Sequence, residues 1–148
     1  MPVMSVATFQ RFFRTAGGLN VDKDDLKRYN DFVQSRILDL LIAARAIAKA
    51  NGRDIVQPAD LPITAGLQER VGEFQALDEE FELSGVLDQL IGRPPDLDLS
   101  EETDARLPLV AGGLSVALAR LFNEAEPELK NLQTRHWEKA FAIFELLL

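Results

Sequence analysis

Few residues in this chain could take part in catalysis or bind a metal ion. His136 is the only histidine, and the 148-residue sequence contains no cysteine. A zinc site built from several imidazoles or thiolates is therefore excluded, and a Ser-His-Asp arrangement would have to use this one imidazole. His136 precedes Trp137 at the start of an apolar helical segment, which favours a capping or packing role. We expect no catalytic residue, no metal site and no cofactor, and hence a protein that is not an enzyme.

Two further patterns could bind ions, but each lacks the residues that such binding needs. The acidic run at 78–82 has neither the alternating ligands nor the turn glycine of a calcium loop, so a solvated helix face is the better interpretation. The glycine pairs at 17–18 and 112–113 lack the lysine and the strand-loop-helix setting of a phosphate-binding loop. Neither pattern predicts a ligand site.

The charge of the chain is divided unevenly. The formal net charge is −8, yet residues 1–53 carry nine Lys and Arg against five Asp and Glu, a net of +4. The remaining residues carry seven basic and nineteen acidic side chains, a net of −12. An acidic chain is not a general nucleic-acid coat protein, because affinity for phosphate depends on Lys and Arg. Only the first part of the chain could face an anion.

The length and the apolar content are those of one compact domain. Apolar residues make up 47% and charged residues 27% of the sequence, as in ordinary globular domains. No uninterrupted apolar stretch approaches the roughly 18 residues of a membrane span, and no signal peptide is evident. We expect a cytoplasmic protein with no membrane contact.

Apolar residues at helical spacing predict the elements of the first half. These are a short helix at 5–16, a long helix at 25–51, an extended piece at 55–56, a short helix from Pro58 and an amphipathic helix at 63–77. Asp24 or Asp25 is expected to cap the long helix. Phe32, Leu38 and Ile42 lie off its main apolar stripe, so this helix is expected to be buried on more than one side.

The second half repeats this order of elements. It contains a short helix at 81–91, a long helix at 101–126 capped by Ser100, and a closing helix at 137–148. A constant offset of 76 residues places Asp24 on Ser100 and Val56 on Leu132. A shared offset for cap, loop and turn indicates an internal duplication.

The order short helix, long helix, short helix, found twice, resembles the histone fold. The segment RFFRTAGGLNVDKDDLKRYNDFVQSRILDLLIAARAIAKANGRDIVQPADL at 11–61 follows the order of one such motif. Arg53 and Asp60 match the arginine and aspartate that clamp the second loop of such motifs to the third helix, and an arginine fork can bind a carboxylate at two points. At the same offset the second repeat has Leu129 and His136, so the clamp is missing there.

The resemblance implies an all-α fold in which two histone-fold motifs pack together as an intramolecular pseudodimer. A single domain at 1–148 would comprise a first motif at 1–66, a linking helix at 67–80 and a second, divergent motif at 81–148. Such doublets resemble a bacterial family of single-chain tandem histone-fold proteins whose function is uncharacterised. The glycines at 112–113 would allow the long helices to approach closely where they cross, and a kink near Pro108 is the alternative.

The resemblance also implies where nucleic acid would bind. In histone-fold dimers the first loop of one motif lies beside the second loop of the other, next to helix N-termini that meet phosphates. The candidate nucleic-acid-binding residues of the resulting basic end are Arg11, Arg14, Lys23, Lys27, Arg28, Lys130 and Arg135. The other end would combine Arg53 and Asp54 with Asp96 and Asp98, where carboxylates cancel any attraction for an anion.

Two functions follow from these expectations. The first is a histone-like protein that binds duplex DNA weakly, without sequence preference and with a steep dependence on salt, and is then associated with the nucleoid. The alternative is a protein-interaction or assembly module without DNA binding. In that case the acidic second half or the apolar sequence FELLL at 144–148 binds a protein partner or another copy of the chain.

Overall fold

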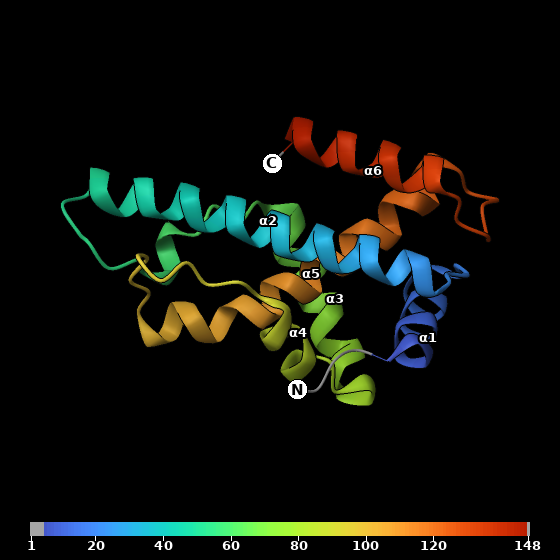
Figure 1. The fold of residues 1–148 in the computed structure, drawn as a ribbon. Coiled ribbons are helices and arrows are strands. Elements are labelled where there is room, and N and C mark those ends of the chain that lie inside the picture. Colours follow the sequence, from blue (N-terminus) through green and yellow to red (C-terminus); the bar gives the residue numbers. More distant parts are fainter. Residues whose placement is uncertain (1–4, 148) are drawn as a thin grey trace.

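The computed structural model describes residues 5–147, so residues 1–4 and Leu148 of the expected domain lie outside the described part. The described chain is all α-helical, as predicted. Its elements are α1 (Val6–Gly17), α2 (Lys23–Ala50), a 3-10 turn η1 (Pro58–Asp60), α3 (Ala65–Phe81), α4 (Ser84–Leu90), α5 (Glu101–Ala125) and α6 (Thr134–Leu147). The two long helices, α2 and α5, form the centre, and the shorter helices are arranged around them (Figure 1).

Helix α5 is the core of the fold. It contacts every other helix, and its buried residues include Leu107, Ala111, Leu114 and Leu118. Within the described residues, α5 is also the one helix long and apolar enough to cross a membrane by composition. Burial of 61% of that apolar window against neighbouring helices accounts for the composition without a membrane.

Side-chain caps fix where the two long helices begin. Asp22, and not Asp24 or Asp25 as expected, caps α2. Its carboxylate accepts a hydrogen bond from the backbone N–H of Asp25, and the carboxylate of Asp25 accepts one from the backbone N–H of Asp22. Ser100 caps α5 through the backbone N–H of Thr103, as predicted.

The two halves of the chain do not keep a constant offset. Helix α2 has 28 residues and α5 has 25. The helix caps Asp22 and Ser100 are therefore 78 positions apart, whereas the last helical residues, Ala50 and Ala125, are 75 apart. The predicted offset of 76 is therefore wrong at both ends of the long helices, because the second of them is three residues shorter, but it holds in the turns after them, where Gln57 and Gln133 are 76 apart.

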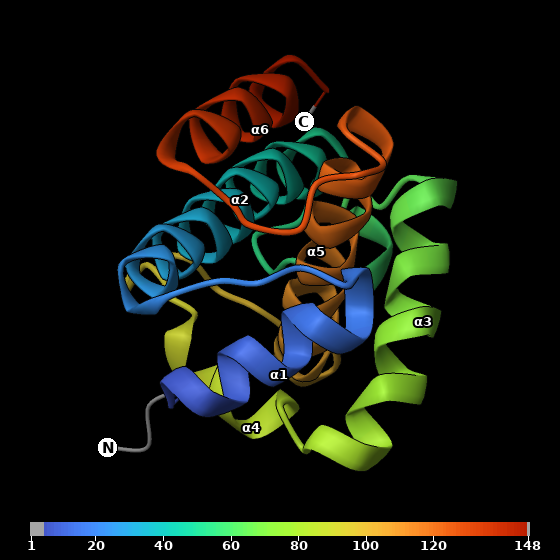
Figure 2. The ribbon, with the colours of Figure 1, turned by 90° about the vertical axis from the view of Figure 1, so that its right-hand side faces the viewer.

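The third helix expected from Pro58 is a single 3-10 turn. Leu61 ends this turn in an extended conformation, because a proline disfavours helical backbone angles at the residue before it. Pro62 thereby separates η1 from α3. Its counterpart α6 is a full helix of 14 residues. Helix α3 covers the segment expected to link the two halves and contacts α5 along its length (Figure 2).

The loops of the two halves pair crosswise. Asn20, before α2, forms a parallel bridge with Asn131, before α6. Val56, after α2, forms the corresponding bridge with Leu99, before α5. The backbone N–H of Val56 donates to Asp98 O at 2.9 Å, and the N–H of Ser100 donates to Val56 O at 3.0 Å. Neither half can therefore complete its loops without the other.

The glycine pair of α5 serves a different contact from the one expected. A methyl group at Gly112 would clash with the ring of Phe74, and one at Gly113 would lie 2.6 Å from Val71 Cγ2. Both partners belong to α3, so these glycines allow α3, and not α2, to approach α5. Pro108 lies inside α5, which continues through it.

Candidate functional site

The clamp predicted in the first half is formed. Arg53 donates from Nη1 to Asp60 Oδ2 at 2.5 Å and from Nη2 to Asp60 Oδ1 at 2.7 Å. The carboxylate also accepts a hydrogen bond from the backbone N–H of Gln57 at 2.8 Å. These hydrogen bonds, with that from Arg53 the strongest cause, lower the pKa of Asp60 to about 2. The pair fixes the loop after α2 and leaves neither charge free for a ligand.

His136 takes the position of Asp60 in the second half. Its Nδ1 accepts a hydrogen bond from the backbone N–H of Gln133 at 2.8 Å, as Asp60 does from Gln57. Its Nε2 lies 3.3 Å from Oε2 of Glu126, which follows the last residue of α5. Glu126 is thus the side-chain partner of His136, as Arg53 is of Asp60 in the first half. His136 is buried, in agreement with a capping role. The partner Glu126 was missed because the constant offset pointed to Leu129.

The predicted basic end is assembled from both halves. The bridge between Asn20 and Asn131 sets the start of α2 beside the loop before α6 (Figure 1). Four cationic side chains at this end are exposed: Lys23, Lys27, Lys130 and Arg135. Arg28 is engaged, because it contacts Asp25 Oδ1 at 3.1 Å and donates to Thr134 Oγ1 at 2.9 Å.

Carboxylates lie among these cations. The capping box of α2 and its first turn contribute Asp22, Asp24 and Asp25, and the loop before α6 contributes Glu126 and Glu128. Only Asp25 is buried, and burial raises its pKa. The helix end that would meet a phosphate thus already carries acidic groups, which lowers its attraction for an anion.

The two arginines of α1 that were expected to extend the basic end differ in their contacts. Arg11 forms an ion pair with Glu80 at 2.7 Å, and its guanidinium lies 4.5 Å from the centre of the Phe81 ring. Arg11 is therefore held against the end of α3. Arg14 is exposed in the last turn of α1.

The opposite end is acidic, as expected. Asp98 and Asp96 lie in the loop that pairs with Val56, and Asp96 contacts Arg45 at 3.3 Å. Arg53 is bound by Asp60, so it adds no free positive charge there. The carboxylates of Asp96 and Asp98 oppose the binding of a phosphate at this end.

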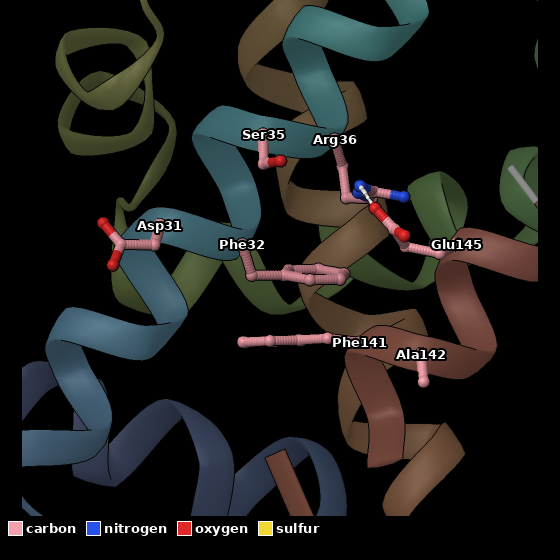
Figure 3. Close-up of a pocket in the computed structure, with 7 residues that line it drawn as sticks. All are labelled: Asp31, Phe32, Ser35, Arg36, Phe141, Ala142 and Glu145. Atoms are coloured by element: carbon pink, nitrogen blue, oxygen red, sulfur yellow. Dashed lines mark hydrogen bonds and ion pairs between the residues drawn. The ribbon is translucent and has the colours of Figure 1, made fainter. Parts of the chain in front are cut away.

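A cleft lies between α2 and α6 (Figure 3). The rings of Phe32 and Phe141 stack with their centres 5.5 Å apart and form its apolar wall, beside a cavity of about 290 Å³. Arg36 is almost fully buried at one side of the cleft and contacts Asp39 at 2.9 Å and Glu145 at 3.4 Å. Its charge is satisfied within the chain, so the cleft has no free cation to bind an anion. Among residues 5–147, no group of three or more His, Asp or Glu side chains could hold a metal ion.

An apolar face of α2 is exposed, which the sequence had not predicted. Leu38 is 39% and Ile42 is 60% exposed, and Ala46 continues the same row at a spacing of four residues. Asp39 and Lys49 flank the row near its two ends. We call these five residues the α2 face. The expectation of burial on this second side is confirmed for Phe32, which packs against α6, and is wrong for Leu38 and Ile42, because α6 ends over the middle of α2 (Figure 1).

The end of α6 adds two exposed apolar residues. Leu146 is 85% and Leu147 is 75% exposed. They belong to the sequence FELLL, whose last residue, Leu148, lies outside the described part. Phe144 of the same sequence is buried against Phe32, with ring centres 4.8 Å apart. FELLL therefore contributes its aromatic residue to the core and Glu145 with its two described leucines to the surface.

The chain is similar to proteins of two bacteria over most of its length. A crystal structure of the protein ttk003001566 from Thermus thermophilus is 51% identical, with a TM-score of 0.86 and coverage of 98% of this chain and 99% of that one. A 1.9 Å crystal structure of protein AQ328 from Aquifex aeolicus has the same fold, with a TM-score of 0.83 at 21% identity, over 96% of this chain and 94% of that one.

Two comparisons of sequence agree with these structures. An uncharacterized protein of Aquifex aeolicus (strain VF5) is 26% identical over 120 residues, which are 80% of this chain and 70% of that protein. The model of the family described as a domain of unknown function, DUF1931, matches residues 9–145, from the first buried phenylalanine of α1 to nearly the end of α6. The chain therefore belongs to the DUF1931 family.

Proposed function

We propose that the chain is a single-chain histone-fold pseudodimer that acts by binding another macromolecule and not as an enzyme. The crosswise loop bridges and the Arg53–Asp60 clamp support the assignment of the fold. The use of the only histidine as a buried cap supports a non-enzymatic role, since His136 Nδ1 is occupied by a backbone N–H.

The proposed function is that of a protein-interaction or assembly module, and the exposed α2 face is the observation that carries it. Single exposed apolar residues are common on protein surfaces, but a continuous row is typical of a contact surface. Leu38, Ile42 and Ala46 form such a row over two turns of α2, whose buried side carries Leu40, Leu41, Ala44 and Ala48. A second row beside it contains the partly or fully exposed residues Ala43, Ile47 and Ala50.

Site-specific photo-crosslinking in living cells tests this function. A photoreactive amino acid at Ala46 should give a covalent protein adduct, which mass spectrometry then identifies. Ala76 is the matched control, because it is an exposed alanine on α3, away from the α2 face. An adduct at position 46 and none at position 76 supports the proposal. Equal or absent adducts at both positions would overturn it.

Weak binding of duplex DNA is the second candidate. It is favoured by the four exposed cations Lys23, Lys27, Lys130 and Arg135, which the loop pairing brings to one end. It is opposed by the carboxylates at that end and by the net charge of −8. These opposing charges place DNA second.

A further inference from the structure

We propose that the partner of the α2 face is a second copy of this chain, bound with the two α2 helices antiparallel. The inference rests on the proposed assembly function and names its partner. It concerns the C-terminal half of α2, which continues beyond the end of α6 (Figure 1).

The first reason is that a large and a small side chain of the α2 face are placed symmetrically about one level of the helix. Ile42 and Ala46 stand two residues before and two residues after the level of Ala44. When two such helices lie antiparallel about a two-fold axis at that level, Ile42 is opposite the partner's Ala46, and Ala46 is opposite the partner's Ile42. A large side chain thus meets a small one twice, which is how helix ridges enter grooves. A symmetric contact requires this kind of self-complementarity.

The second reason is charge. Asp39 and Lys49 stand five residues before and five after the same level, so each Asp39 faces the partner's Lys49 at the two ends of the contact. The distance along the helix between these two residues is about 15 Å at 1.5 Å per residue. Asp39 is 47% exposed and Lys49 is exposed. A parallel arrangement would instead place Asp39 opposite Asp39 and Lys49 opposite Lys49, so these two residues favour the antiparallel one.

The small size of the contact sets the expected affinity. About three helical turns, with an alanine at one of the three apolar positions of the α2 face, provide less surface than a permanent dimer usually buries. The dimer should therefore be reversible, with a dissociation constant on the order of micromolar. This is an association that concentration can control.

Sedimentation velocity of the full chain over a range of concentrations tests the proposal. The wild-type protein should shift from one to two copies of the 16.5 kDa chain as concentration rises. Ile42→Glu should weaken association at least tenfold. Ile55→Glu is the matched control, because Ile55 is 48% exposed but lies in the loop after α2, outside the face. A wild-type protein that stays monomeric at every concentration, or an equal effect of both variants, would overturn the dimer.

A charge exchange tests the register of the two helices. Asp39→Lys and Lys49→Asp should each weaken association, because each places like charges opposite one another, and the double variant should restore it. Asp39 also contacts Arg36, so circular dichroism must show that each variant is folded. A folded double variant that stays weakened would contradict the antiparallel register.

The crosslinking result separates this inference from the function on which it rests. If the adduct at position 46 contains a different protein and not a second copy, the dimer is wrong and the assembly function stands. If position 46 gives no adduct and sedimentation shows no dimer, both are wrong.

Discussion

Arg53 and Asp60 are joined by two parallel hydrogen bonds across the loop that follows α2. The loop between them contains Val56, whose backbone N–H and C=O both bond to the loop before α5. The side chain of Thr103 also donates to Val56 O at 2.8 Å. The clamp thus positions the backbone groups that join the first half of the chain to the second.

Removal of the clamp should lower stability modestly. Arg53→Ala should reduce the melting temperature by about 1 to 4 °C, because a partly exposed ion pair adds little but the loop loses its restraint. Arg45→Ala is the control, since Arg45 forms a single, more exposed contact with Asp96. Differential scanning calorimetry should show a larger loss for Arg53→Ala than for Arg45→Ala. Equal losses would mean that the clamp has no special role.

The clamp should also make stability depend on acid pH. The pKa of Asp60 is lowered from 3.8 to about 2 in the folded chain, so its carboxylate stabilises the fold above the unfolded value. That contribution is lost as the pH falls from about 4 to about 2. The difference in melting temperature between wild type and Asp60→Asn should therefore be constant above about pH 5 and shrink below pH 4. A difference that is unchanged down to pH 2 would contradict the lowered pKa.

The helix pattern and the local motifs could be predicted from the sequence because each depends on neighbouring residues. The periodicity gave the long helices, Ser100 was identified as a cap, and the pairing of Arg53 with Asp60 followed from the histone-fold resemblance. The start of α2 was missed because three aspartates there can all cap a helix. Asp22 is chosen because Asp25 can then return a hydrogen bond to the backbone N–H of Asp22.

Features that depend on a distant partner could not be predicted in the same way. Whether Leu38 and Ile42 are buried or exposed depends on where α6 ends. The apolar pattern of α2 alone does not reveal the position of that end. The carboxylates at the basic end are visible in the sequence. Only the pairing of loops around Asn20 and Asn131 shows that they share one surface with the cations.

The close approach of α3 to α5 should make Gly113 intolerant of a side chain. In Gly113→Ala the new methyl group would lie 2.6 Å from Val71 Cγ2 and 3.0 Å from the Val71 backbone N, so α3 must move. We expect a loss of about 1 to 3 kcal/mol in the free energy of unfolding, measured by urea denaturation. Gly72→Ala is the control, because nothing lies within 4 Å of its added methyl group, and it should gain up to about 1 kcal/mol from helix propensity. A neutral Gly113→Ala would mean that the two helices are not in close contact.

Binding of DNA should be weak and should depend on the cations of both halves. A 30-base-pair duplex labelled for fluorescence anisotropy should bind at low salt and dissociate near physiological salt. With four phosphate contacts, the slope of log K against log salt should be about −3.6. Lys27→Glu and Lys130→Glu should each weaken binding, because they act from opposite sides of the bridge between Asn20 and Asn131.

The control for DNA binding is Lys49→Glu, which changes the net charge equally but lies at the far end of α2. If all three variants lose affinity to the same extent, binding follows net charge and not a surface. If the wild-type protein fails to bind even at low salt, the carboxylates around Asp22 and Glu126 outweigh the cations and the DNA candidate is wrong. Because the α2 face contains none of the four cations, Ile42→Glu should leave the affinity for DNA unchanged apart from the effect of its one added negative charge, which should be smaller than the effect of Lys49→Glu, a change of two charge units.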